Sequence, residues 1–296
     1  MNIQQLKIII ELSQQRTLVE IAHRLELTQP TVSFHIKKLE EELGVPLVEK
    51  QSRNLKMTKA CLELVPYARQ ILELMEEAKR RVIEVNGLSQ PKLRIGASHT
   101  PATYFLPPFI KQFQKLHPEL EVQVRVNQTL TAIEMLRHHQ LDLAIISLPD
   151  FTIEGLNLHP LVEDRLLLVF APENRLSSLE KISVEELGRE TFLLHEAGST
   201  SRTVTDDWVK STGLRLHHAM ELGAIETIKE GIKCNMGIGI LPQISVDREL
   251  KDGTLLAHPL PSYEDRRCIC LVHRNEASLP GQLSSFIWFA IENMKQ

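Results

Sequence analysis

Two apolar helical stripes joined by a very short connection dominate residues 18–44. Their positions are Leu18, Ile21, Ala22 and Leu25 in the first helix and Val32, Ile36, Leu39 and Leu43 in the second. This spacing is typical of helices that bury one face against a core. Thr28 suits the N-cap of the second helix, Pro30 is tolerated in its first turn, and Gly44 is a natural end. The pattern therefore predicts two helices at a tight turn.

The opposite face of the second helix carries residue types that suit double-stranded DNA. Gln29 can pair with adenine, Ser33 can bond a base edge or a phosphate, and an outward Phe34 can contact thymine methyl groups. Lysines on the same face suit phosphates. An amphipathic helix with a solvated basic face is the alternative, but it gives no reason for an outward aromatic ring. The predicted DNA contacts of this helix are Thr28, Gln29, Pro30, Thr31, Ser33, Phe34, Lys37 and Lys38.

The run LELTQPTVSFHIKKLEEELGVPL, residues 25–47, lies within a segment that resembles the N-terminal domain of LysR-type transcriptional regulators. The resemblance implies a winged helix-turn-helix over residues 1–58, with residues 49–53 as its wing. It further implies that Lys50 and Arg53 contact the DNA backbone or the minor groove. Phe34 stands where the family commonly has a polar or basic residue.

Residues 59–85 are rich in Leu, Ala, Glu, Lys and Arg and predict one long helix. Its apolar stripe comprises Leu62, Val65, Leu72, Met75 and Val82. We expect Pro66 to kink it, because proline removes a backbone donor. With the linker-like residues 86–91 it forms a predicted linker segment, 59–91. The resemblance implies that this helix pairs two subunits, and that effector domains also associate side by side, giving a dimer or a tetramer.

Charge and length fit this division of the chain. The 296 residues exceed one comfortable core and suggest about two domains. The whole chain has a net charge of -4, whereas residues 1–60 have nine basic and seven acidic side chains, a net +2. A basic front on an acidic body fits a small DNA-binding domain. No apolar run is long enough for a membrane span and no signal peptide is evident, so we expect a cytoplasmic protein.

Beyond Pro91 the pattern alternates between strands and helices. Predicted strands are Leu93–Ala97, Val122–Val126, Leu141–Ile146, Leu166–Phe170, Phe192–Leu194, Ile238–Leu241 and Cys268–Val272. Predicted helices are Pro108–Leu116, Ala132–His138, Ser201–Lys210, Ile225–Cys234 and Gln282–Met294. Such alternation predicts parallel α/β sheets with crossover connections.

The same resemblance implies that residues 92–296 form a two-lobed α/β effector domain, similar to periplasmic solute-binding proteins. Lobe one is expected at 92–161 and 268–296, and lobe two at 162–267. The fold class is therefore α/β behind an N-terminal winged helix-turn-helix and a long linker helix.

Three loops, 96–101, 195–202 and 223–225, each follow a predicted strand and open a helix. Hydroxyl groups and free N–H groups at a helix N-terminus favour an anion, and an arginine can pair with a carboxylate. Each loop alone is equally well a capped helix start, but the family binds its inducers at these positions. We predict a small anionic metabolite bound by Ser98, Thr100, Asn127, His195, Ser199, Thr200 and Arg202.

The remaining motifs do not indicate a metal site, a cofactor site or an enzyme. Cys268 and Cys270 lie on one side of a strand, and we interpret them as structural thiols rather than a metal or redox pair. Gly237 and Gly239 do not form a dinucleotide fingerprint, because a third glycine is missing. No nucleophile elbow or phosphate-binding loop is present, so we predict no enzyme, no catalytic residue, no metal and no cofactor.

The sequence thus predicts a regulator whose partners are double-stranded DNA, a small-molecule effector and further copies of itself, with RNA polymerase as another candidate. Three alternatives remain: a solute-binding component, a regulator triggered by thiol oxidation, and an enzyme with a DNA-binding appendage. The operator, the effector and the direction of regulation do not follow from the sequence.

Overall fold

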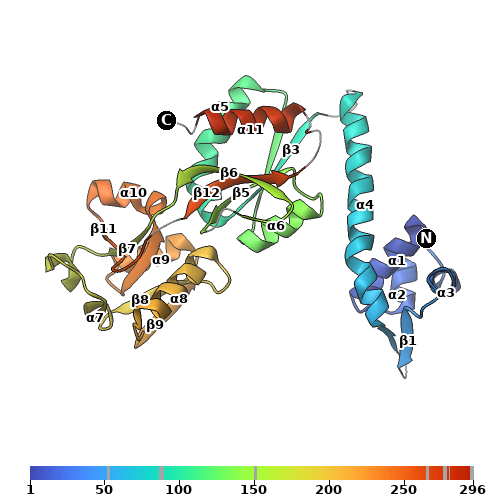
Figure 1. The fold of residues 1–296 in the computed structure, drawn as a ribbon, viewed down its shortest axis with the longest axis horizontal. Coiled ribbons are helices and arrows are strands. Elements are labelled where there is room, and N and C mark those ends of the chain that lie inside the picture. Colours follow the sequence, from blue (N-terminus) through green and yellow to red (C-terminus); the bar gives the residue numbers. More distant parts are fainter. Residues whose placement is uncertain are drawn as a thin grey trace. The chain divides into compact units, whose positions relative to one another are not determined.

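A computed structural model describes residues 1–51, 54–86, 90–149, 152–264, 267–275, 279 and 281–293. The chain divides into two compact units. One comprises residues 1–89 with 138–140, and the other comprises residues 90–137 with 141–296. Figure 1 shows a helical first unit and a second unit built on two sheets.

The first unit begins with three short helices, α1 (Ile3–Ser13), α2 (Leu18–Arg24) and α3 (Gln29–Leu43). A two-stranded antiparallel hairpin follows, β1 (Val48–Gln51) with β2 (Asn54–Met57). We call residues 1–57 the head. Its core contains Ile9, Ile21, Val32 and Leu39, none of which is exposed. The two predicted helices and the turn between them are therefore present.

Local chemistry fixes the ends of these helices. The Thr17 hydroxyl accepts from the Glu20 N–H while the Glu20 carboxylate accepts from the Thr17 N–H, which is a capping box. The Thr28 hydroxyl caps α3, and Gly44 ends it in the left-handed conformation at φ 71°. The prediction that Leu43 points inward is wrong: its side chain is 44% exposed, because it lies in the last turn, beyond the core.

Helix α4 (Lys59–Val85) has 27 residues and runs through Pro66 without ending there. The predicted single apolar stripe is divided between two faces. Val65 and Leu72 pack against the head core, whereas Leu62 and Val82 are exposed. The reason is that α4 packs against α1 only along part of its length and circumference.

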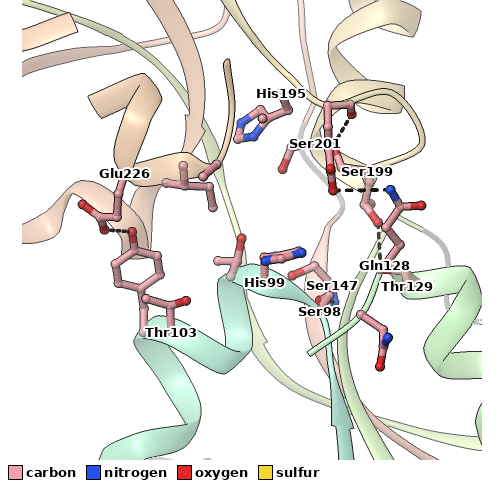
Figure 2. Close-up of a pocket in the computed structure, with 18 residues that line it drawn as sticks. Ser98, His99, Thr103, Gln128, Thr129, Ser147, His195, Ser199, Ser201 and Glu226 are labelled. Carbon is pink, nitrogen blue, oxygen red and sulfur yellow. Dashed lines mark hydrogen bonds between the residues drawn. The ribbon is translucent and has the colours of Figure 1, made fainter. Parts of the chain in front are cut away.

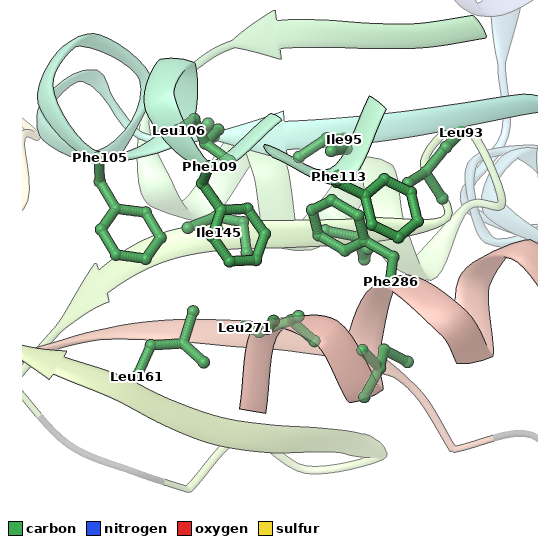
Figure 3. Packing of buried hydrophobic residues seen from close by; sticks show 14 of the residues in the cluster. Leu93, Ile95, Phe105, Leu106, Phe109, Phe113, Ile145, Leu161, Leu271 and Phe286 are labelled. Carbon is green, nitrogen blue, oxygen red and sulfur yellow. The ribbon is translucent and has the colours of Figure 1, made fainter. Parts of the chain in front are cut away.

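Lobe one is a five-stranded sheet with the order β4-β3-β5-β12-β6. Its strands are β3 (Lys92–Ala97), β4 (Glu121–Val126), β5 (Leu143–Leu148), β6 (Leu156–Glu163) and β12 (Cys268–Arg274). Its helices are η1 (Pro101–Phe105), α5 (Leu106–Leu116), α6 (Thr129–Arg137) and α11 (Gly281–Asn293). One face packs on α5 and α11 through an aromatic cluster around Phe109, Phe113 and Phe286 (Figure 3). The other face packs on α6.

Lobe two is a second five-stranded sheet with the order β11-β7-β10-β8-β9. Its strands are β7 (Leu166–Phe170), β8 (Thr191–His195), β9 (His218–Gly223), β10 (Ile238–Pro242) and β11 (Leu256–Pro259). Its helices are η2 (Arg175–Ser178), α7 (Val184–Leu187), α8 (Thr200–Thr212), α9 (Ile225–Lys233) and α10 (Gln243–Asp252). Trp208 of α8 fills one core, and Ile228 and Ile232 of α9 contribute to the other.

The predicted parallel pairing with crossover connections is present in both sheets, in the pairs β3–β4, β3–β5, β8–β9 and β8–β10, but each sheet also contains antiparallel strands that the prediction did not include. β12 runs antiparallel to β5 and β6, and β7 runs antiparallel to β10 and β11. Sequence analysis did not find β6, β9 or β11. All three are edge strands, and β6 contains Pro160 while β9 is largely exposed, so none has the apolar run of a buried strand.

The chain passes between the lobes twice, after Glu163 and before Cys268. A buried ion pair joins the two crossings: Arg267 Nη2 lies 2.8 Å from Asp164 Oδ2. The backbones are also paired, since the Asp164 N–H donates to the Arg267 carbonyl. The two crossings are therefore held as one hinge.

Candidate functional site

The first turn of α3 presents an exposed polar and aromatic surface. Gln29, Pro30 and Phe34 are exposed, with Phe34 at 61%, while Thr31 and Ser33 are half-buried. The Thr28 hydroxyl caps the helix by accepting from the Thr31 N–H at 3.3 Å. The cap therefore fixes the N-terminal turn, and the side chains predicted to contact bases lie on one accessible surface.

Lys37 and Lys38 are both exposed on α3. Lys37 Nζ lies 3.9 Å from Glu41 Oε1, and both side chains are more than 60% exposed, so the pair is weak. Lys38 has no ion pair with any residue that the structure describes. Both charges are available to phosphates.

The predicted wing corresponds to the β1–β2 hairpin, in which Lys50 pairs with Leu55. The side chain of Lys50 and the whole of Arg53 lie outside the described residues. Sequence analysis missed Glu40 of α3, whose carboxylate accepts from the backbone N–H groups of Leu47 and Val48 at 2.7 and 3.2 Å. Glu40 thus fixes where the hairpin begins relative to α3.

A cavity of about 260 Å³ lies between the two lobes of the second unit. The ends of β3, β5 and β8 and the first turns of η1, α6, α8 and α9 surround it (Figure 2). The cavity is lined by Ser98, His99, Thr100, Thr103, Tyr104, Asn127, Gln128, Thr129, Ser147, His195, Glu196, Ser199, Thr200, Ser201, Gly223, Ala224, Ile225 and Glu226. All three predicted loops therefore converge on one cavity.

Six of the seven predicted ligand-binding residues line the cavity, and Arg202 does not. Its guanidinium donates to Asp206 at 2.9 and 3.1 Å and to Glu221 at 2.9 Å. These hydrogen bonds raise the pKa of Arg202, and the bond to Asp206 has the largest effect. Arg202 is the third residue of α8, and its side chain reaches the i+4 carboxylate and the edge strand β9.

Among the residues that the structure describes, the lining contains no lysine and no arginine, but it does contain two carboxylates, Glu196 and Glu226. Lys229, a buried residue of α9, pairs with Glu226 at 3.3 Å and with Glu249 at 2.7 Å. The polar lining is otherwise made of hydroxyl, amide and imidazole groups. A ligand would therefore meet mostly neutral donors and acceptors.

His195 ends β8 and is 5% exposed. Its Nε2 lies 3.1 Å from the Ile240 carbonyl oxygen. The pKa of His195 is lowered to about 4, chiefly by burial. The hydrogen bond to Ile240 raises the pKa, and the positive charges of Arg267 and Arg202 lower it further. The ring is therefore neutral near pH 7.

Hydrogen bonds connect the lobes at both ends of the cavity (Figure 2). At one end the Tyr104 hydroxyl of lobe one donates to the Glu226 carboxylate of lobe two. At the other end Gln128 Nε2 donates to Glu196 Oε1 at 3.3 Å, and the hydroxyl groups of Thr129 and Thr200 lie 3.0 Å apart. A change in the angle between the lobes would break these contacts.

Comparison with known proteins matches most of the chain to two families. Residues 3–62 match "Bacterial regulatory helix-turn-helix protein, lysR family", and residues 86–295 match "LysR substrate binding domain". This chain belongs to the LysR family of transcriptional regulators. The predicted family, the fold class and the function of a DNA-binding regulator with an effector domain are confirmed.

Individual relatives agree with this assignment. The LysR-type regulator is 34% identical over 255 residues to a "Probable RuBisCO transcriptional regulator" of Cyanidium caldarium, covering 84% of this chain and 80% of the relative. Its fold matches the Synechocystis PCC6803 CcmR regulatory domain in complex with 2-PG, with a TM-score of 0.64 and 24% identity. The match covers 70% of this chain and 99% of the CcmR domain. It also matches full-length CbnR complexed with its target DNA, with a TM-score of 0.68, 19% identity, and coverage of 99% of each chain. Named relatives are transcriptional regulators, which are not enzymes.

Two of the four cysteines of the LysR-type regulator, Cys61 and Cys270, offer little reactivity. Burial raises the pKa of Cys61 to about 11 and that of Cys270 to about 12, so both stay protonated near pH 7. Cys234 is exposed and Cys268 is half-buried.

Within the described ranges, no three His, Cys, Asp or Glu side chains form a group that would hold a metal ion. None of the described helices is long and apolar enough to span a membrane.

Several cavity residues of the regulator were missed by sequence analysis, chiefly Ser147, Gln128 and Thr129. Ser147 lies in β5, beside β3, and the rule that ligands bind at the carboxyl ends of parallel strands would have indicated it. Gln128 and Thr129 directly follow the predicted Asn127 at the start of α6. No sequence signal indicated Tyr104 or Glu226, because their contact joins positions 122 residues apart.

Proposed function

We propose that this regulator binds DNA through the N-terminal turn of α3 and that a small anionic metabolite in the interlobe cavity changes its DNA binding. The observation that carries the proposal is a cavity lined from both lobes and bounded by hydrogen bonds between them. A ligand that contacts both lobes favours one lobe angle over another, which is the differential interaction that allostery requires.

The DNA-binding part of the proposal rests on the exposed face of α3. Gln29 and Ser33 are placed for base edges, Phe34 for thymine methyl groups, and the two lysines for phosphates. Thr28, Pro30 and Thr31 shape the turn that carries them. Lys50 and Arg53 remain predicted wing contacts.

The ligand part rests on the donors that the cavity presents. The first turns of α8 and α9 face it, and free N–H groups at a helix N-terminus favour a negative group. The volume of about 260 Å³ is below the roughly 300–1,000 Å³ of sites for drug-sized ligands, so the ligand is small. A relative's domain in complex with 2-PG supports this class of site.

Self-association through α4 is part of the same proposal. Leu62, Tyr67, Ile71 and Leu74 are 37–60% exposed on this helix, away from the head core. A second copy of the same helix would cover them, and a twofold dimer would place two α3 helices on the two half-sites of a near-palindromic operator. We place the protein in the cytoplasm, where it has access to chromosomal DNA.

Binding of the full chain to the DNA upstream of its own coding region tests the function. We expect affinity for that duplex at least ~10³-fold above a random duplex, with a steep loss as salt rises. DNase footprints with and without the effector test the coupling. Equal, weak binding to both duplexes and to a library of selected sequences would contradict the proposal.

A further inference from the structure

Two buried polar atoms at the interlobe cavity have no hydrogen-bond partner among the described residues, the Ser147 hydroxyl oxygen and the Asn127 side-chain oxygen. His195 also lines the cavity, and its ring bonds to the described residues through Nε2 and not through Nδ1. Ser147 is only 4% exposed and His195 only 5%. Buried polar atoms usually have partners, so these side chains indicate where a ligand binds.

The tautomer of His195 follows from its one hydrogen bond. The Ile240 carbonyl can only accept, so the Nε2 atom 3.1 Å away must carry the proton. In the neutral ring the other nitrogen, Nδ1, is then an acceptor. The group that meets it in the cavity must be a donor, such as a hydroxyl.

Lobe one presents donors on the other side of the cavity. The Ser98 hydroxyl oxygen accepts from the Ser147 N–H at 3.1 Å, which leaves the Ser98 proton free to donate. The Ser147 hydroxyl is free in the same way. Ser98, Ser147 and His195 lie around one space in Figure 2, with the two serines on lobe one and the histidine on lobe two.

The surrounding charge limits the ligand. The described part of the lining has two carboxylates and no cationic side chain, and Lys229 is paired with Glu226 and Glu249. Helix α9 begins at Ile225, and its N-cap residue Ala224 provides no side-chain cap, so the positive end of this helix favours one negative charge in the cavity. A ligand with several negative charges would meet like charge without a compensating lysine or arginine.

We propose that the effector is a small hydroxycarboxylate with one negative charge, whose carboxylate accepts from Ser98 and Ser147 and whose hydroxyl donates to His195 Nδ1. This inference rests on the proposed effector function of the cavity. His195 thereby determines specificity, because it rejects analogues without a hydroxyl. The ligand bridges the lobes through these contacts.

The test uses the full chain and matched probes. Isothermal titration compares glycolate, glycerate and shikimate with their deoxy counterparts acetate, propionate and cyclohexene carboxylate, and with phosphoglycolate as a more highly charged probe. We expect a hydroxycarboxylate to bind best. His195→Gln keeps an N–H donor for Ile240 but takes the acceptor away from the position of the ring Nδ1, so it should weaken binding of that probe about tenfold and leave binding of the deoxy counterpart unchanged. Ser147→Ala, a small change in a buried site, should weaken both.

A second measurement does not need a ligand. Long-range ¹H–¹⁵N spectra should show His195 as the Nε2–H tautomer. An Nδ1–H tautomer, a best ligand that lacks a hydroxyl, failure of every hydroxycarboxylate to bind, or an equal effect of His195→Gln on both probes would overturn the inference. The proposed function fails separately, through loss of specific DNA binding or of any effect of ligands on the footprint.

Discussion

The head and the interlobe cavity present their proposed binding residues in opposite ways. On α3 the functional side chains are contiguous in sequence and exposed, and their partner lies entirely outside the chain. Around the cavity the side chains come from seven separate elements, and several are more than nine-tenths buried. Substitutions on the head should therefore change DNA binding with little effect on stability, whereas substitutions around the cavity should change both ligand binding and stability.

The largest expected effect is at the hinge behind the cavity. Arg267→Leu leaves Asp164 buried and unpaired, which should cost about 3–5 kcal/mol in the free energy of unfolding. Urea unfolding followed by tryptophan fluorescence measures this, because Trp208 and Trp288 both lie in the second unit.

The matched control is Arg165→Leu at the same crossing. Arg165 pairs with Glu163 at 2.7 Å, but both side chains are at least 64% exposed, so the change should cost about 0.5 kcal/mol or less. Equal losses in the two variants would show that burial does not distinguish these pairs. Replacing Asp164 and Arg267 together by leucine should recover part of the stability.

The next effect concerns pH. The unfolded chain protonates His195 near pH 6.5, whereas the folded chain does so only near its pKa of about 4. As the pH falls through this window the unfolded chain binds the extra proton, so the free energy of unfolding decreases, by roughly 3 kcal/mol at most. Arg267 and Arg202 are the charges that reinforce the low pKa.

Unfolding titrations of the native chain and of His195→Gln between pH 4 and pH 7 measure this dependence. The variant should show a flatter curve in that window. Parallel curves would mean that other groups carry the acid sensitivity, and that His195 is not held neutral by its surroundings.

Smaller effects are expected on the head. Lys37→Ala should weaken binding about fivefold to all duplexes alike and reduce the salt slope by about one, because it removes one phosphate contact. Ser33→Ala should weaken binding to the operator more than binding to random DNA. Fluorescence anisotropy measures both, and neither variant should change the unfolding curve.

Lys79→Ala on α4 is the control for charge alone. Lys79 is 61% exposed and pairs only with Glu76 among the described residues. It should leave DNA binding unchanged. A loss as large as that of Lys37→Ala would show that net charge, rather than the α3 surface, sets the affinity.

The smallest effect sharpens the link between the lobes. Gly198 has φ +85°, and a Cβ there would lie 3.1 Å from Gln128 Oε1 across the cavity edge. Gly198→Ala should lower the free energy of unfolding by about 1 kcal/mol, because alanine is strained at a positive φ. It should also disturb the response of DNA binding to the effector. Gly253→Ala, at φ +74° with nothing within 4 Å of its Cβ, should cost a similar amount of stability and leave that response intact.

Local sequence signals were enough to predict the two helices of the helix-turn-helix and the buried strands of both sheets. These signals act over only a few residues, so they can be recognised in the sequence alone. They are the helix caps at Thr17 and Thr28, the helix end at Gly44 and the apolar spacing of α2 and α3. The strands β3, β7 and β10 were found in the same way, from short apolar runs with buried neighbours on both sides.

The tertiary structure alone decided the direction of β12, the placement of the edge strands and the composition of the cavity. The contact of Ser98 with Ser147 spans 49 residues, and that of Tyr104 with Glu226 spans 122. Arg202 was predicted in the cavity because its loop was, yet its side chain is held by Asp206 and Glu221. Local backbone preferences set where a loop lies, whereas the partners available in the folded chain set where a long charged side chain goes.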